Sequence, residues 1–143
     1  MLTIAQKMLE GNNLCVLATC SNNLPNSSLM HYIYDGIGMN IYMLTLRGSV
    51  KHINISANPQ VSLLIDTRVD YPQPGISVMA LTVHGKAGII QDPQRHQTLV
   101  DQLVARNGSL AKLASDSQCL VIQVQMEKMI LLDGVNDIST INI

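Results

Sequence analysis

Two hydroxyl groups and an ammonium group lie close together near the middle of the chain. The side chains of interest in this stretch are Thr45, Arg47, Gly48, Ser49 and Lys51. The apolar run 41–44 before them is typical of a buried strand, and residues 50–57 after them have the composition of a short helix. The start of a helix carries unpaired N–H groups and partial positive charge, so these side chains would form a pocket for an anion, typically a phosphate. An ordinary helix start, with Ser49 as its cap and Lys51 in solvent, fits the same residues.

Composition restricts the class of protein. The chain has 143 residues, of which 47% are hydrophobic and 13% are charged, and its net charge is −1. This length predicts a single domain over residues 1–143 with a substantial core. Because no broad basic surface is implied, nucleic acid is not an expected partner. The low share of charged residues suits a chain that buries part of its surface against a partner.

The cysteines and the hydropathy pattern indicate which cellular compartment to expect. Cys15, Cys20 and Cys119 form no Cys-x2-Cys pair. We expect them to be small buried apolar groups in a reducing compartment, with a catalytic or metal-bound cysteine as the alternative. No apolar run reaches ~18 residues, and the N-terminus lacks the pattern of a secretion signal. We therefore expect no membrane segment and a cytoplasmic location.

Periodicity and turn residues predict the elements that position these side chains. Helices are expected at 3–11, 50–57 and 93–106, the last capped by Asp92, with one or two further turns at 109–114. Strands are expected at 14–20, 27–35, 40–45, 61–66, 76–90, 119–126 and 129–132. Gly85 and Gly88 are expected to be bulges or bends, and residues 70–75 are expected to form a loop. The tail after Gly134 has no assigned element.

These elements favour a mostly β fold, a small β-barrel with peripheral helices and six to seven mainly antiparallel strands. The first three strands are joined by short turns, whereas a parallel sheet would need a long crossover after nearly every strand. The dinucleotide and flavodoxin-like sites of parallel sheets are therefore excluded.

The order of these motifs resembles a known family. Thr45-x2-Gly48-Ser49-x-Lys51 is followed by Asn58-Pro59-x-Val61-Ser62-Leu63-Leu64, and then by Val83-x-Gly85-x-Ala87. Over about residues 1 to 127 the chain resembles the pyridoxamine 5′-phosphate oxidase-like family of FMN-binding split barrels. The resemblance implies a split barrel that forms a homodimer, with FMN bound in clefts between the two subunits.

The resemblance also implies which residues bind the cofactor. Thr45, Ser49 and Lys51 would hold the FMN phosphate, and Arg47 lies close enough in sequence to join them. Leu44 and the extended run 27–30 would lie along the isoalloxazine ring, largely through their backbone. The predicted cofactor-binding residues are thus Ser27, Ser28, Leu29, Met30, Leu44, Thr45, Arg47, Ser49, Val50 and Lys51.

The chain departs from the family pattern at several positions. Val50 stands where the true oxidases usually have Arg, and Ser27 and Tyr32 stand near positions where they have an Arg and a Lys that grip FMN. A Gln that approaches the flavin falls near Ala80, and residues 118–143 contain no counterpart of the substrate-phosphate residues. The resemblance therefore supports FMN binding and does not support oxidation of vitamin B6.

Three functions follow as hypotheses: an FMN-dependent oxidoreductase of unknown substrate, a non-catalytic FMN carrier or sensor, and a haem-binding split-barrel protein. No side chain is predicted to be the catalytic acid or base, and no histidine has the spacing of a metal site. His31 is either a proton donor near the flavin or a strand histidine facing solvent or an interface. His52 either adds positive charge to the phosphate site or points to water, and His96 is expected on a solvated helix face. Tyr32 and Tyr34 are expected either to stack near the flavin or the dimer interface or to form plain core.

Overall fold

The computed structural model describes residues 2–68, 74–75, 77–134 and 136–143. Its helices are α1 (Leu2–Gly11), α2 (Val50–Ala57), α3 (Pro93–Arg106) and α4 (Ala111–Ala114), with a 3₁₀ turn at Gly108–Leu110 before α4. Its strands are β1 (Leu14–Ser21), β2 (Leu24–His31), β3 (Ile33–Asp35), β4 (Asn40–Leu46), β5 (Gln60–Asp66), β6 (Met79–Ile89), β7 (Cys119–Asp133) and β8 (Asp137–Asn142). Most of the predicted loop 70–75 lies outside the described residues.

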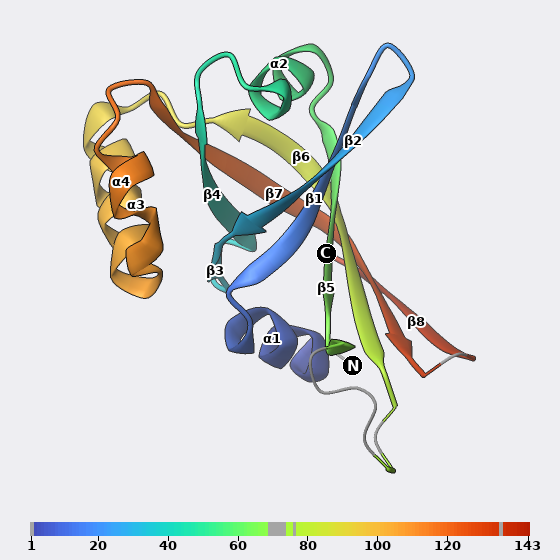
Figure 1. Ribbon diagram of the computed structural model, residues 1–143. Helices are drawn as coiled ribbons and strands as arrows, with labels where there is room; N and C mark the ends of the chain where they lie inside the picture. The colour runs from blue at the N-terminus through green and yellow to red at the C-terminus, as the bar shows by residue number, and fades with distance from the viewer. Residues whose placement is uncertain (1, 69–73, 76, 135) are drawn as a thin grey trace.

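The strands form one antiparallel sheet that curls into a split barrel (Figure 1). The order across the sheet is β2-β1-β5-β6-β7-β4-β3, and β8 pairs with β7 beyond this path. The two strands at the ends of this order, β2 and β3, are separated in the chain only by Tyr32, so the sheet curls until its edges meet. The helices cover the periphery, as predicted, with α3 and α4 on one side and α2 over one end of the barrel (Figure 1).

A bulge helps the long strands to bend. The pairing of β6 with β7 shifts between His84 and Gly85. His84 lies opposite Lys128, whereas Gly85 lies opposite Met126, so β7 has one extra residue at this point. A Cβ at Gly85 would collide with the backbone carbonyl of Gln125, so only glycine permits this close approach. The predicted bulge at Gly85 is confirmed. At Gly88 the pairing with β7 runs without a shift, so of the predicted bulge or bend the structure contains no bulge at this position.

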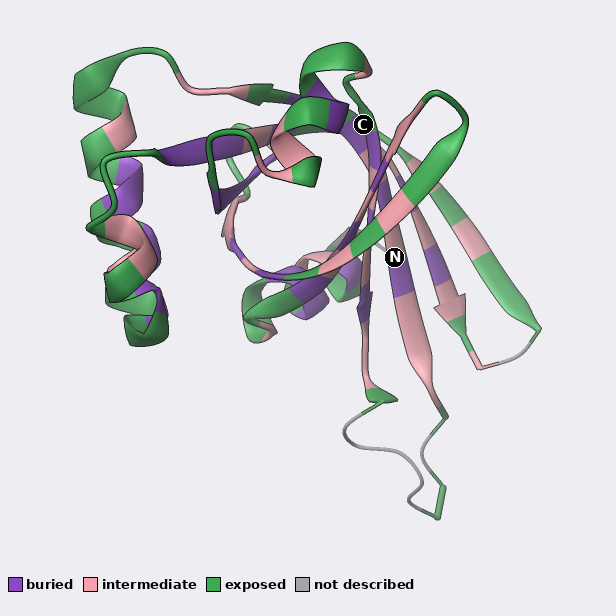
Figure 2. Ribbon diagram, turned by 45° about the horizontal axis from the view of Figure 1, so that its top comes forward, coloured by how far each residue is buried: buried purple, intermediate pink, exposed green. Residues whose placement is uncertain are grey.

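Strand β4 separates two cores. Ile41 and Met43 point into the barrel, where they join the larger apolar cluster. Tyr42 and Leu44 point to the opposite face, where they pack under α3 together with Leu103. Figure 2 shows these buried positions lining the inside of the curled sheet and the inner side of α3. The alternation of side chains along a strand therefore decides which of the two spaces each β4 residue faces.

The number of strands is eight instead of six or seven, because one predicted strand divides, two merge and the tail adds one. The extended segment 27–35 divides at Tyr32, whose N–H donates to the Asn13 carbonyl (3.1 Å). Here the chain leaves β2, which pairs with β1, and enters β3, which pairs with β4. The predicted strands 119–126 and 129–132 are one strand, β7, which continues through the bulge. The unassigned tail forms β8 along the second half of β7.

Candidate functional site

The two hydroxyl groups of the predicted anion site are in contact. Thr45 Oγ1 and Ser49 Oγ are 2.8 Å apart, with either oxygen able to act as the donor. Thr45 ends the inward-facing row of β4 and is buried, whereas Ser49 caps α2 by accepting the backbone N–H of His52 (3.2 Å). The turn between β4 and α2 thus brings both hydroxyls to the positive end of a helix, which is the arrangement an anion requires.

The turn is held in shape by a second local contact. Gly48 has a φ of +80°, a conformation that favours glycine, and its N–H donates to Nδ1 of His52 (2.9 Å). This contact ties the turn to the first helical turn of α2. From the sequence, His52 was expected either to add positive charge to the phosphate site or to point to water. Its role as a hydrogen-bond acceptor depends on the backbone bend at Gly48, which no sequence pattern predicts.

Lys51 supplies the charge of this corner. It lies in the first turn of α2, two residues after Ser49, and is half-buried. Within the described ranges the structure contains one ion pair, Arg68 with Asp66, so no carboxylate neutralises the Lys51 ammonium. Val50 is 58% exposed beside it and adds an apolar surface next to the ammonium group. The two hydroxyls and this free cation fit a phosphate group.

Arg47 is directed elsewhere. Its N–H donates to the Gln118 carbonyl (2.9 Å), and it lines a separate cavity of about 560 Å³ together with His52 and His96. Neither Thr45 nor Ser49 lines that cavity. The structure thus groups the predicted phosphate residues in two places, with the hydroxyl pair on one side of the turn and Arg47 on the other.

The predicted ring-contacting residues lie on β2 and β4. β2 is an edge strand of the described sheet, and it contacts β4 across the split of the barrel. Along 27–30 the outward side chains are exposed, Leu29 to 69%, while Met30 is buried in the core. The Leu44 side chain is buried under α3, so this residue can offer a flavin only its backbone. Contact through the backbone remains a prediction that fits this geometry.

The two tyrosines are structural. Tyr32 is 1% exposed, and its hydroxyl donates to the Leu9 carbonyl at the end of α1 (2.6 Å). Burial raises the pKa of the Tyr32 phenol above its usual range. Tyr34 packs against the same core and its hydroxyl lies 3.6 Å from Met39 Sδ. Where the related oxidases have a Lys near Tyr32, this chain therefore has a core residue that anchors α1.

The outer face of the sheet carries an apolar row. Register places Leu29, Val16, Leu64, Thr82, Ile130 and Thr140 side by side across the strands from β2 to β8. Their strand neighbours fill the barrel, so alternation points this row outward. We call it the outer row.

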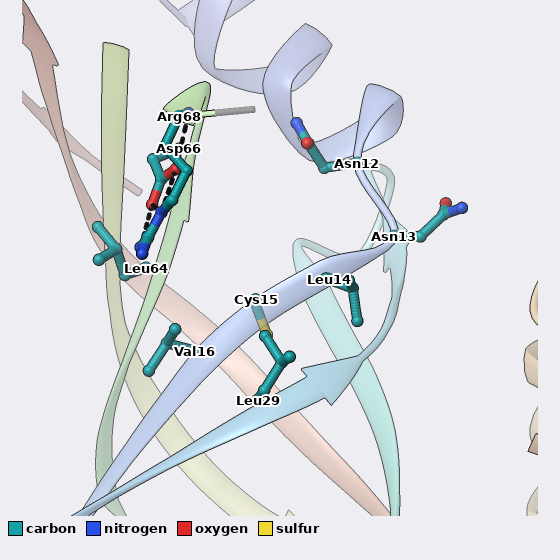
Figure 3. A pocket seen from close by; sticks show the side chains of 9 residues that line it. All are labelled: Asn12, Asn13, Leu14, Cys15, Val16, Leu29, Leu64, Asp66 and Arg68. Carbon is teal, nitrogen blue, oxygen red and sulfur yellow. Dashed lines mark hydrogen bonds and ion pairs between the residues drawn. The ribbon is translucent and has the colours of Figure 1, made fainter. Parts of the chain in front are cut away.

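A hollow of about 370 Å³ lies beside the outer row at the α1 end of the strands. Figure 3 shows the side chains that line it. Leu14, Val16, Leu29 and Leu64 form its apolar wall. On the β5 side, Asp66 pairs with Arg68 at 2.6 Å, and this contact holds the pKa of the carboxyl below its usual range.

The cysteines and His31 are the remaining candidate functional groups. Cys15 and Cys119 are buried as expected, Cys20 is half-buried, and all three are free thiols. His31 is half-buried, and its Nδ1 has no hydrogen-bond partner. Among the residues described, no group of three or more His, Cys, Asp or Glu is placed to hold a metal ion. No helix in the described ranges is long and apolar enough to cross a membrane.

Comparisons with solved structures establish the fold. General stress protein 26 from Bacillus anthracis str. Sterne superposes with a TM-score of 0.77 at 23% identity, covering 99% of this chain and 98% of that one. An FAD-binding protein from Mesorhizobium loti gives a TM-score of 0.74 at 18% identity, covering 90% of this chain and 91% of that one. HutZ, a haem storage protein from Vibrio cholerae, gives 0.73 at 18% identity, covering 92% of both chains. These neighbours share the split barrel, and the descriptions of the last two name different groups, FAD and haem.

The sequence was also compared with protein families and with curated proteins. A search of curated proteins found no match. The family model for pyridoxamine 5′-phosphate oxidase matches residues 3–132, which is most of the chain. The motifs that suggested this resemblance, the curled antiparallel sheet and the family match agree. This chain belongs to the pyridoxamine 5′-phosphate oxidase family of split-barrel proteins.

Proposed function

We propose that the protein binds FMN and acts as a flavin-dependent oxidoreductase, with the flavin at the interface of a homodimer. The observation that carries this proposal is the pair formed by Thr45 Oγ1 and Ser49 Oγ, 2.8 Å apart at the start of α2. With Lys51 in the next helical turn, the pair offers two hydroxyl donors and one cation to the phosphate of FMN. On phosphate binding, the hydroxyl that donates within the pair would turn its proton toward a phosphate oxygen, and the proton of the accepting hydroxyl is already free to do so.

The flavin ring requires a second surface, and the free edge of β2 supports one. An edge strand has unpaired backbone N–H and C=O groups, which match the alternating donors and acceptors of a flavin pyrimidine ring. β2 contacts β4, the strand that leads into the hydroxyl pair, so one ligand can reach both. This arrangement uses residues 27–30 through their backbone and does not depend on their side chains.

The outer row supports the proposed homodimer. Leu29 is 69% exposed, Leu14 is 42% exposed and Ile138 is 65% exposed, all on the outer face of the sheet. An apolar sheet face of this extent is a common site of protein association. A second copy of the chain offers the same apolar row, and a two-fold axis would bring the two rows together.

Bound FMN would supply hydride or electron transfer, and the chain would supply binding and orientation. Lys51 and the hydroxyl pair hold the charged end of the cofactor. The β2 edge fixes the ring, and the apolar outer face keeps water from one side of the interface. Residues 118–143 contain no counterpart of the family's substrate-phosphate residues, which argues against a substrate resembling vitamin B6.

Haem binding is the second candidate function. The specific observation for it is His31, whose Nδ1 is buried without a hydrogen-bond partner and offers a free imidazole nitrogen. A split-barrel neighbour from Vibrio cholerae is described as a haem storage protein. A non-catalytic flavin carrier would use the same binding residues as the oxidoreductase.

The deciding experiment is reconstitution of the purified protein with FMN, riboflavin or haemin, followed by visible spectroscopy. We expect saturable FMN binding that is much tighter than binding of riboflavin, which lacks the phosphate. Equal affinity for the two flavins would contradict the phosphate assignment, and a Soret band with haemin that is lost in His31→Ala would favour the second candidate. Reduction of bound FMN by NADH or NADPH separates an enzyme from a carrier.

A further inference from the structure

The cavity that Arg47 lines is distinct from the proposed flavin site. It lies where α2, the start of α3 and the ends of β6 and β7 meet, and its volume is about 560 Å³. This volume is within the range of small-molecule pockets. Its polar side chains include Arg47, His52 and His96, and its apolar wall includes Ile90 and Leu120. Among the described residues, no Asp or Glu lines it.

Arg47 is positioned for this cavity by its backbone. The bond from its N–H to the Gln118 carbonyl fastens the β4–α2 turn to the segment that begins β7. Because the ion pair of Asp66 with Arg68 is the one found in the described ranges, the Arg47 guanidinium is not neutralised by a carboxylate. A guanidinium offers a planar set of donors that matches two oxygens of a phosphate.

The two histidines come from different helices. Nδ1 of His52 accepts the Gly48 N–H, so the proton of the neutral ring is on Nε2, which is then a donor. His96 lies in the first turns of α3 and is half-buried against the same space. Two carboxylates adjoin the lining residues in sequence: Asp92 caps α3 by accepting the Arg95 N–H (2.8 Å), and Asp116 accepts the Gln118 N–H (2.8 Å). Donors from three elements thus converge on one cavity without an acceptor charge among them.

We propose that this cavity is a second ligand site, which binds a small phosphorylated molecule. Arg47 and His96 contact the phosphate, His52 Nε2–H donates to it, and Ile90 and Leu120 contact the carbon part of the ligand. The site is separate from the FMN cradle, because the inward-facing Thr45 and its partner Ser49 do not line it. The proposal goes beyond flavin binding and does not depend on it.

The test uses phenyl phosphate, which joins a phosphate to an apolar ring, with phenol as the uncharged control. Two-dimensional NMR of the isotope-labelled protein would follow the titration. We expect saturable shifts centred on Arg47, His52 and His96 with phenyl phosphate and none there with phenol. His96→Gln should weaken binding ~5-fold and Arg47→Gln ~10-fold, since each removes a charged or polar phosphate contact. Lys112→Gln, a change at an exposed lysine of α4, should have no effect.

Three outcomes would overturn the proposal: no saturable shift, shifts confined to Thr45 and Lys51, or unchanged affinity in both variants. Circular dichroism and the NMR spectrum of each variant show whether it is folded, and His96→Asn serves as a second change at the same position. FMN titration of His96→Gln separates the two sites, because its FMN affinity should equal that of the wild type. Failure of FMN binding in the wild-type protein would contradict the proposed function and leave the phenyl phosphate result intact.

Discussion

Replacing Lys51 with alanine tests the charge of the proposed phosphate cradle. A hydrogen bond to a charged group contributes about 1.5–3 kcal/mol. Lys51 is half-buried, so water screens part of its charge and the lower end of this range applies. A loss of ~1.5 kcal/mol corresponds to about 10-fold weaker FMN binding. The alanine keeps helix propensity high, so the fold of α2 should not change.

The assay is quenching of FMN fluorescence at fixed ionic strength, with riboflavin measured in parallel. Because riboflavin has no phosphate, its affinity should be the same in wild type and Lys51→Ala. Lys112→Ala is the matched control, since it removes an exposed lysine from another helix and should alter neither affinity. Equal losses for FMN and riboflavin, or no loss for FMN, would refute the assignment of Lys51 to the phosphate.

Three further predictions concern stability and assembly. Ser49→Ala removes the cap of α2 and leaves the buried Thr45 hydroxyl without its partner. The free energy of unfolding measured in urea should therefore fall by about 2–3 kcal/mol. A fall below ~0.5 kcal/mol would show that the contact does not stabilise the fold. Leu29→Lys places a charge on the outer row at a 69% exposed position, so light scattering should show a monomer whose circular dichroism spectrum matches that of the wild type. A persistent dimer would contradict the proposed interface. Burial raises the pKa of the Cys15 thiol from 9.0 to about 12, so the folded state holds this proton more tightly than the unfolded state. The free energy of unfolding should therefore decline as pH rises above about 9. Between pH 9 and 11 the free energy of unfolding of Cys15→Ala, measured in urea, should decline less than that of the wild type, by up to ~1.4 kcal/mol per pH unit. If the two proteins give parallel curves against pH, the thiol does not titrate as proposed.

Much of the fold was predictable because its signals are local. Pro59 ends α2 in sequence as in structure, Asp92 followed by Pro93 starts α3, and the short turns near β1 imposed antiparallel pairing. The hydroxyl pair was predictable for the same reason, since Thr45 and Ser49 are four residues apart and one helix start brings them together. In each case the partners are close in the chain, so spacing alone limits their geometry.

Other features depended on partners far away in the chain. The break at Tyr32 is stabilised by Leu9 and Asn13 of another segment, and β8 exists because the second half of β7 offers it an edge. Polar residues 127–128 suggested the end of a strand, but the bulge opposite Gly85 lets β7 continue past them. Because the partners of Tyr32 and of Gly85 lie far from them in the chain, no short stretch of sequence predicts these pairings.

The sequence by itself determined that this chain forms a curled antiparallel sheet of the pyridoxamine 5′-phosphate oxidase family, with two hydroxyls and a lysine at the start of α2. Only the tertiary structure decided where the neighbouring charges point. Arg47 lies between Thr45 and Ser49 in the sequence, yet it lines another cavity, because the turn is fastened to Gln118 and meets His96 of α3 there. Spacing sets which backbone groups begin a helix, whereas the direction of an exposed side chain depends on the elements that the folded sheet brings beside it.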